Sequence, residues 1–308
     1  MSWKQSTLPS PTGAALCLYS SLPKGKPKAI LQINHGMAEH AARYERFAKA
    51  LNEAGYGVFA HDHRGHGATV AQDAPLGIFA AKNGLEAVLS DIDAVNQHIR
   101  QDHPQVPIIC FGHSMGSILG LNYALRNSSN IDGVALWNAG VETGALALVY
   151  GLILKTQRIF KGSDVPSGIA AKLTFETWNK EFAPNRTPSD WLSRDEAEVD
   201  KYVADPLCGF DVSIGLWLDL LGAIYYGADD ANLARLPRDM PVHLLAGDKD
   251  PCTEKGQSVR NLADRMQRIG LSDVKLTVLS DTRHESLNET NREETTRDFI
   301  AWLDKHWA

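Results

Sequence analysis

Pro107-Ile-Ile-Cys-Phe-Gly-His-Ser-Met-Gly-Ser117 is the stretch that decides the fold of this chain. Residues 106–111 are almost continuously apolar, which is typical of a strand buried on both faces of a sheet. The next five residues spell G-x-S-x-G around Ser114, and residues 118–126 have the composition of a helix. A strand, a tight turn and a helix in this order form the setting in which G-x-S-x-G carries a nucleophile. The stretch therefore predicts that Ser114 is catalytic, whereas the plainer alternative is an ordinary strand–helix turn with a capping serine.

The segments on either side continue the alternation of strands and helices. Apolar runs predict strands over residues 14–19, 28–33, 56–60, 106–111, 131–137, 242–246 and 274–279. Helical spacing predicts helices over residues 44–51, 88–99, 118–126 and 259–269. The spacing of Ser286 and Glu289 is that of a capping box, so a last helix is expected to begin near Ser286. Alternating strands and helices form a parallel sheet with right-handed crossovers, which makes the fold class α/β.

The strand rhythm stops between residues 140 and 230. This segment contains two apolar helical stretches, over residues 145–154 and 214–226, and several tryptophans. We expect it to be a helical cap inserted over the strand ends. The predicted core is then made of residues 1–139 and 231–308, and residues 140–230 form the cap.

Composition excludes several classes of protein. The chain has 308 residues, a net charge of -6 and no cluster of Lys and Arg, which argues against a nucleic-acid partner. The four cysteines follow no metal spacing, and a reducing compartment suits them. The N-terminal residues lack the pattern of a signal peptide, and the most apolar run, residues 145–154, is short of the ~20 residues of a spanning helix. The sequence therefore predicts a soluble cytoplasmic protein.

A serine nucleophile needs a base, and the base needs an acid that orients it. In a parallel sheet these partners are expected in loops that follow later strands. His284 is the only histidine in such a loop, and Asp248 and Asp250 in the preceding loop compete for the role of the acid. Asp281 is expected to be a solvated turn residue. The order Ser, Asp, His along the chain is that of the α/β-hydrolases.

The oxyanion of a tetrahedral intermediate needs hydrogen-bond donors. The N–H of Met115, directly after the nucleophile, is one natural donor, and the loop after an early strand offers the N–H of Met37 as the second. The histidine-rich residues 61–66 lack the spacing of a metal site, and we expect a hydrogen-bonded loop there instead. We expect no metal and no other cofactor.

Taken together, these motifs resemble one branch of the α/β-hydrolases, that of the monoacylglycerol lipases and bacterial lysophospholipases, hydrolases of the serine aminopeptidase S33 type. The matching segments are His35-Gly-Met-Ala-Glu-His40 with Arg43-Tyr44, Asp62-His-Arg-Gly-His-Gly67, Gly112-His-Ser-Met-Gly116, Gly247-Asp-Lys-Asp250, Arg283-His-Glu-Ser-Leu-Asn-Glu289, and in the cap Trp191-Leu-Ser-Arg-Asp195 and Asp205-Pro-Leu-Cys-Gly209. The resemblance implies a mostly parallel eight-stranded sheet with helices on both faces and a helical cap.

The resemblance also implies roles for individual residues. Ser114, Asp250 and His284 would form the catalytic triad, and Met37 and Met115 would be the oxyanion donors. Three further residues, Glu39, Arg43 and His113, would lie near a polar pocket for a glycerol or head group. The alternative for Glu39 and Arg43 is a loop–helix ion pair without substrate contact, and His113 could simply brace the neighbouring loop.

The function expected from these residues is that of a serine carboxylester hydrolase acting on monoacylglycerol, lysophospholipid or a similar medium-chain ester. The cap helices would line an acyl channel and touch a membrane or micelle surface for a time, although their apolar residues could also only pack the cap onto the sheet. One alternative is an aminopeptidase or amidase, which needs a carboxylate in the cap such as Glu176, Glu181 or Glu196. Another is a ligand-binding module without catalysis.

Overall fold

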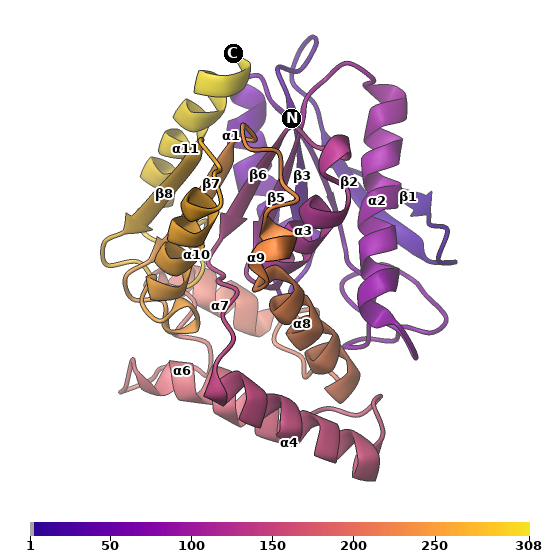
Figure 1. The fold of residues 1–308 in the computed structure, drawn as a ribbon, viewed down its shortest axis with the longest axis vertical. Coiled ribbons are helices and arrows are strands. Elements are labelled where there is room, and N and C mark those ends of the chain that lie inside the picture. The colour runs from indigo at the N-terminus through magenta and orange to yellow at the C-terminus, as the bar shows by residue number, and fades with distance from the viewer. Residues whose placement is uncertain (1–2) are drawn as a thin grey trace.

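The predicted alternation forms one eight-stranded sheet of order β1-β2-β4-β3-β5-β6-β7-β8 (Figure 1). The computed structural model describes residues 3–308, apart from the side chain of Leu146. The strands are β1 Lys4–Pro9, β2 Ala15–Ser21, β3 Ile30–Asn34, β4 Gly57–His61, β5 Ile108–His113, β6 Gly133–Trp137, β7 Val242–Gly247 and β8 Val274–Leu279. The six strands from β3 to β8 pair in parallel, and β2 joins β4 in the antiparallel direction.

Strand β1 was not predicted from the sequence. It pairs antiparallel with β2 at the edge of the sheet, and its side chains are almost all exposed. An exposed edge strand has no buried face, so its sequence shows no alternation of apolar and polar residues. The expectation of eight strands came from the family resemblance, because the apolar runs alone predict seven.

Helices cover both faces of the sheet and connect its strands (Figure 1). The α-helices are α1 Glu45–Glu53, α2 Gly84–Asp102, α3 Met115–Arg126, α4 Ala145–Lys161, α5 Gly168–Ala171, α6 Thr177–Lys180, α7 Glu196–Ala204, α8 Ile214–Gly227, α9 Asp230–Leu233, α10 Gln257–Arg268 and α11 Arg292–Trp307. Short 3-10 turns cover Ala41–Tyr44, Ser128–Asn130 and Pro251–Thr253, and a π-helical turn covers Lys172–Glu176.

Two hydrophobic cores lie on opposite faces of the sheet. In β5, Ile108 and Cys110 belong to one core, and Ile109 and Phe111 belong to the other. The first core also takes apolar residues from α2, α3, α8 and α10, and the second takes them from α1 and α11. The continuous apolar run before Ser114 is explained by this double burial, because successive side chains of a strand point to opposite faces.

The segment between β6 and β7 contains helices and no strand of the sheet. Figure 1 shows α4 and α6 at the bottom of the view, apart from the strands, with α8 between them and the core. Helix α8 packs against α4 and also against α2 and α3, so it connects the two parts. We propose that residues 140–230 are the cap on the core formed by residues 1–139 and 231–308. Within the described residues, no helix has both the length and the hydropathy that crossing a bilayer requires.

The prediction that the last helix begins near Ser286 is wrong, because α11 begins at Arg292. The Ser286 hydroxyl donates to Asn138 Oδ1 over 2.9 Å, and a Glu289 oxygen accepts the backbone N–H groups of Arg194 and Arg283. These two side chains therefore hold a loop against β6 and the cap instead of capping a helix. The loop is the one that carries His284.

Candidate active site

Ser114 lies on a sharp turn between β5 and α3. Its backbone has φ 52° and ψ −122°, a conformation that costs a non-glycine residue about 1–3 kcal/mol. Gly112 and Gly116 make the turn feasible: a Cβ on Gly112 would lie 2.3 Å from the Gly116 carbonyl oxygen, and one on Gly116 would lie 2.0 Å from the Asn34 carbonyl oxygen. Both glycines of the motif are thus required by close backbone approach.

The side chain of Ser117 stabilises the turn by hydrogen bonds to the backbone of β5 and of β6. Its hydroxyl lies 2.7 Å from the carbonyl oxygen of Gly112 and 2.8 Å from that of Trp137, and it accepts the Trp137 N–H. The N–H of Ser114 itself donates to the Trp137 carbonyl over 2.9 Å. Neighbouring strand β6 therefore fixes the strained backbone of the serine.

Asp250 and His284 meet at the carboxyl ends of β7 and β8. His284 Nδ1 lies 3.0 Å from Asp250 Oδ1, and the two side chains are almost fully buried. The carboxylate also accepts the Cys252 N–H and the Asn138 side-chain amide. An aspartate held in this way orients the ring with Nδ1–H as the donor, which leaves Nε2 free to accept a proton.

The competing carboxylates lie elsewhere. Asp248 stays in the turn after β7, where its N–H donates to the Leu279 carbonyl, and Asp281 is exposed and pairs with Arg194. Of the three acids weighed in the sequence, Asp250 is the one that the structure brings to His284. Asn138, which also contacts the loop of His284, was missed because nothing in its local sequence distinguishes it.

Two cavities of different character share Ser114 and Met37. The first, the polar cavity, has a volume of about 250 Å³ and is lined by His284 together with Glu39, His113, Tyr202, Asp211 and Glu285, among others. The second, the apolar cavity, has a volume of about 540 Å³ and is lined by side chains from α4 and α8, including Tyr150, Ile153, Trp217, Leu220 and Ile224. Met115 lines the apolar cavity, so both predicted oxyanion donors lie beside the serine.

A buried charge network stands behind the polar cavity. Glu39 accepts the Gly36 N–H and the Tyr44 hydroxyl, and it pairs with Arg43 at 2.5 Å. Arg43 also makes a two-pronged pair with Glu285, with both N–O distances 2.7 Å. Sequence reasoning missed Glu285 as a partner, although it directly follows the candidate base.

The ion pairs of this network position the three residues that were expected near a head group, Glu39, Arg43 and His113. Glu39 and His113 line the polar cavity, but Arg43 does not, because its guanidinium is held by Glu39 and Glu285. The ion pair between Glu39 and Arg43, which was the alternative expectation, is therefore present, and Arg43 does not line the polar cavity. The hydrogen bond that the Gly36 N–H donates to Glu39 also fixes the loop that carries Met37.

His113 connects the network to the base. Its Nε2 lies 3.0 Å from the His284 carbonyl oxygen, and its Nδ1 lies 3.5 Å from Glu39 Oε1. Although burial opposes charge, Glu39 raises the pKa of His113, and Arg43 and His113 hold the pKa of Glu39 well below its usual range. His113 thus braces the backbone of His284 through its ring nitrogen.

The histidine-rich residues 61–66 are buried, and their backbone and the carboxylate of Asp62 are hydrogen-bonded. Asp62 accepts the N–H groups of Ala41 and Ala68, both over 2.8 Å. The His63 N–H donates to His35 Nε2 over 2.9 Å. Burial lowers the pKa of His35 to about 4 and that of His61 to about 3. The hydrogen bond to His35 connects this loop to the segment that follows β3.

Comparison with known proteins gives consistent matches. The family model described as serine aminopeptidase, S33, matches residues 25–291. The monoglyceride lipase of Mus musculus is 31% identical over 250 residues, which are 80% of this chain and 73% of that protein. The monoacylglycerol lipase of Mycolicibacterium smegmatis is 27% identical over 297 residues, 92% of this chain and 91% of that protein.

A solved structure confirms the expected fold. A thermostable carboxyl esterase from Bacillus coagulans, in complex with glycerol, superposes with a TM-score of 0.91 at 24% identity and covers 100% of both chains. A structure described as a lipase in its open form superposes with a TM-score of 0.86 at 26% identity, covering 98% of each chain. The sheet with its helical layers is therefore the α/β-hydrolase fold.

Proposed function

The chain belongs to the serine aminopeptidase S33 family of α/β-hydrolases, in the branch that contains the monoglyceride lipases, and we propose that it is a serine carboxylester hydrolase. Its proposed substrate is a monoacylglycerol, a lysophospholipid or a similar medium-chain ester. One observation carries this proposal: Ser114 opens onto a polar cavity and a larger apolar cavity at once. An ester with a polar alcohol and an apolar acyl chain matches both spaces.

In the proposed mechanism His284 Nε2 takes the proton from the Ser114 hydroxyl, and the serine oxygen attacks the ester carbonyl. The N–H groups of Met37 and Met115 hold the oxyanion. His284 then protonates the leaving alcohol, which gives an acyl-enzyme on Ser114. A water activated by His284 releases the fatty acid, while Asp250 keeps the imidazole in the required tautomer.

Placement of the two halves of the substrate follows from the cavity walls. The acyl chain would lie along α4 and α8, where the lining is apolar, and the alcohol would lie beside Glu39 and His113. Trp217 and Leu221 of α8 line the apolar cavity. Leu148 and Leu152 instead lie on the exposed face of α4.

The test is hydrolysis of p-nitrophenyl esters from acetate to palmitate, with 1-monoacylglycerol and lysophosphatidylcholine, by the wild type and by Ser114→Ala. Loss of the nucleophile of a triad lowers kcat by about 10⁶-fold. We expect activity that depends on Ser114 and rises with chain length. Activity restricted to acetate and butyrate would contradict the acyl channel, and activity unchanged in Ser114→Ala would contradict the mechanism. Absence of labelling by a fluorophosphonate would favour a ligand-binding module.

The family description also favours a second candidate, an aminopeptidase. Of the three cap carboxylates named from the sequence, Glu176 lines the polar cavity, whereas Glu181 pairs with Lys255 and Glu196 with Arg186. Glu176 could therefore bind a free amino group. Cleavage of amino-acyl nitroanilides that is lost in Glu176→Gln, without cleavage of acyl esters, would decide for this candidate.

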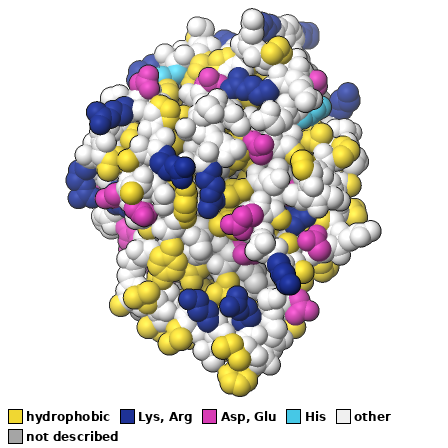
Figure 2. Space-filling view, turned by 45° about the vertical axis from the view of Figure 1, so that its right-hand side comes forward, with side chains coloured by type: hydrophobic (Ala, Val, Ile, Leu, Met, Phe, Trp, Pro, Cys, Tyr) yellow, Lys and Arg dark blue, Asp and Glu magenta, His cyan; other side chains and the backbone are white. Residues whose placement is uncertain are grey.

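We further propose that the cap touches a membrane or micelle surface. Ile159 and Phe160 at the end of α4 are 78% and 82% exposed, and Leu148 and Leu152 are exposed on the same helix. Lys155, Arg158 and Lys161 lie among them. Figure 2 shows yellow apolar side chains and dark blue basic side chains together at the lower end of the molecule. Apolar and basic side chains side by side suit an anionic lipid surface.

Sedimentation with liposomes of phosphatidylcholine and phosphatidylserine tests this contact. We expect the wild type to sediment and the double variant Ile159→Glu/Phe160→Glu to stay in the supernatant. Val70→Glu is the matched control, because Val70 is 68% exposed but lies outside the cap. Equal sedimentation of all three proteins, or none at all, would remove the proposal.

A further inference from the structure

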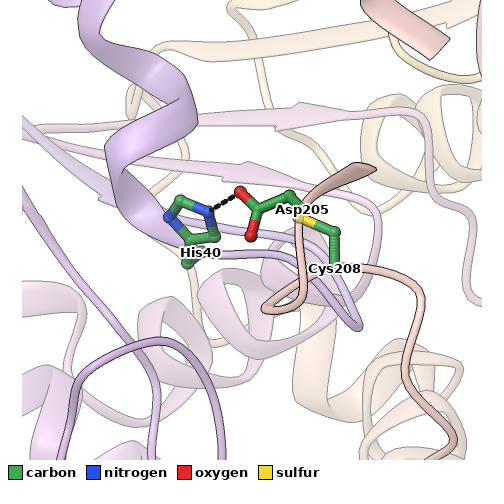
Figure 3. A group of neighbouring side chains, drawn as sticks. All are labelled: His40, Asp205 and Cys208. Carbon is green, nitrogen blue, oxygen red and sulfur yellow. Dashed lines mark hydrogen bonds and ion pairs between the residues drawn. The ribbon is translucent and has the colours of Figure 1, made fainter. Parts of the chain in front are cut away.

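Three side chains that can ligate a metal meet where the cap touches the loop after β3. His40 belongs to that loop, and Asp205 and Cys208 belong to the loop that follows α7. His40 Nε2 lies 2.8 Å from Asp205 Oδ2, and the cluster offers one ligand atom each from His40, Asp205 and Cys208 within 4.8 Å of one another. Figure 3 shows the ring of His40 facing the carboxylate, with the thiol of Cys208 on the same loop as Asp205.

Other contacts hold these two loops together, so the cluster does not depend on one hydrogen bond. The Gly209 N–H and the Tyr202 hydroxyl both donate to the Ala38 carbonyl, over 2.9 and 3.0 Å. Asp205 Oδ1 accepts the Leu207 N–H over 2.8 Å, which turns Oδ2 toward His40. The donor atoms are therefore positioned in advance by the backbone.

The donor set suits Zn²⁺. Imidazole nitrogen, carboxylate oxygen and thiolate sulfur are the three kinds of ligand that zinc takes in proteins, at bond lengths that place tetrahedral donors about 3.3–3.7 Å apart. The present separations, 2.8 Å and up to 4.8 Å, bracket that range, so shifts of about one ångström would close the site. Water would supply the fourth ligand.

The charges around the cluster favour a cation. Arg43 is the positive group beside Cys208, and its charge is matched by both Glu39 and Glu285. Asp205 adds another negative charge. These carboxylates outnumber the guanidinium of Arg43, and the imidazole of His113 contacts Glu39 rather than Asp205, so a divalent ion would lie beside a negative Asp205.

We propose that His40 Nε2, Asp205 Oδ2 and Cys208 Sγ bind one zinc-like divalent ion, which fastens the cap loop to the loop that carries Met37. On binding, the Cys208 thiol releases its proton to solvent as the metal–sulfur bond forms. The proton that His40 Nε2 donates to Asp205 leaves Nε2, and solvent returns one to Nδ1, so that a metal–nitrogen and a metal–oxygen bond replace the hydrogen bond. Ala38, Tyr202 and Gly209 line the polar cavity, so the ion would stabilise one wall of that cavity. The site stands apart from the proposed hydrolysis and is tested without it.

A second group of possible metal ligands, within the described residues, must be kept from binding the metal in the experiment. Asp250, Cys252 and His284 also offer donor atoms within 4.8 Å of one another. These belong to the candidate active site, and a soft metal there would obscure the result. The measurements are therefore made in a Cys252→Ser background.

The experiment is a titration of the Cys252→Ser protein with Co²⁺, followed by competition with Zn²⁺. We expect one Co²⁺ per chain, with the near-ultraviolet band of a thiolate–cobalt bond and the visible bands of a tetrahedral ion. Adding Cys208→Ser should abolish the thiolate band, and adding His40→Gln should weaken binding by at least about tenfold. Zn²⁺ should raise the Tm of the Cys252→Ser protein in proportion to the logarithm of its concentration.

His306 provides a matched control. His306 Nε2 lies 2.8 Å from Asp273 Oδ2, the same distance as in the proposed site, but no thiol completes this pair among the described residues. His306→Gln should leave the cobalt spectrum and affinity unchanged. A thiolate band that persists in Cys208→Ser/Cys252→Ser, or the lack of any such band in Cys252→Ser, would overturn the proposal. Circular dichroism establishes that each variant is folded.

Discussion

The polar and apolar cavities meet at Ser114 and Met37 and differ in most of their other walls. The polar cavity is built by loops at the ends of core strands, by the loop around Ser189 and by Tyr202 of α7, and charged groups stand behind it. The apolar cavity is built largely by side chains of α4 and α8, and its volume is about twice as large. The difference teaches that the segment between β6 and β7 contributes walls to both cavities, whereas its helices α4 and α8 line only the apolar cavity, on the proposed acyl side.

Helix α4 illustrates how one helix serves two environments. Tyr150 and Ile153 line the apolar cavity, and Leu148 and Leu152 are exposed on the other side. The exposed side carries large apolar residues beside its basic ones, which a helix that only packs onto a core would not require. The exposed face is therefore available for a lipid surface, while the inner face is available for an acyl chain.

The largest effect is expected where the two cavities meet. Asp250→Asn would present an amide to His284 and favour the wrong tautomer of the imidazole, so kcat should fall by about 10⁴-fold for every ester. Both halves of the substrate would be affected equally, because the triad acts on the bond between them. The measurement is kcat for methyl and glycerol esters of one fatty acid.

Asp248→Asn is the matched control for this variant. Asp248 lies in the same loop but makes its backbone contact with Leu279, away from His284. We expect its kcat to stay within about threefold of the wild type. Equal losses in the two variants would mean that the loop, rather than the carboxylate at position 250, supports catalysis.

The next largest effect concerns the apolar cavity alone. Ile224 on α8 lines this cavity and does not line the polar one. Ile224→Trp would fill space for the acyl chain, so kcat/KM should fall by about 10–100-fold for palmitate esters and change little for acetate. Ile159→Trp, on the exposed face of α4, should leave the chain-length profile unchanged. An equal loss on acetate and palmitate would break the assignment of this cavity to the acyl chain.

A smaller effect is expected from the buried histidine His61. Burial lowers the pKa of His61 to about 3, whereas an unfolded histidine titrates near pH 6.5. The folded state therefore binds fewer protons, so the contribution of His61 is complete above about pH 6.5 and is lost as the pH falls toward 3. Between pH 7 and pH 5 the free energy of unfolding should fall by about 2 kcal/mol on account of this group.

His61→Gln removes the titrating group while keeping a polar side chain. Urea denaturation at pH 7 and pH 5 should show a difference between the two pH values that is smaller by about 2 kcal/mol in the variant. An identical pH dependence in both proteins would mean that the acid sensitivity arises in another part of the molecule.

The two regions were also unequally predictable from the sequence. The sharp turn around Ser114 was located by its motif, because close backbone contacts require both glycines. A requirement of this kind is visible in the local sequence. The loops of Asp250 and His284 were located because strands of a parallel sheet end at one edge. The choice of Asp250 over Asp248 depended on the family resemblance, since both acids lie in one turn.

What the sequence could not give arises from contacts between distant segments. Arg43 was expected near the head group, but its pair with Glu285 joins residues that no local spacing relates. Strand β1 has no buried face, and the spacing of Ser286 and Glu289 imitated a capping box while both side chains made tertiary contacts. Likewise, neither the spacing of His40 nor that of Cys208 indicates that they meet.

The smallest effect is expected on the alcohol side, and it sharpens the comparison from the other direction. Ser189 lines the polar cavity and not the apolar one. Ser189→Phe would occupy space for the glycerol, so kcat/KM for a monoacylglycerol should fall by about tenfold. The methyl ester of the same fatty acid should be affected much less, because its alcohol is small. This is the reverse of the profile expected for Ile224→Trp, which discriminates by acyl chain and not by alcohol. If Ser189→Phe and Ile224→Trp gave the same profile across the ester series, the two cavities would act as one space, and the separate assignment of alcohol and acyl chain would have to be abandoned.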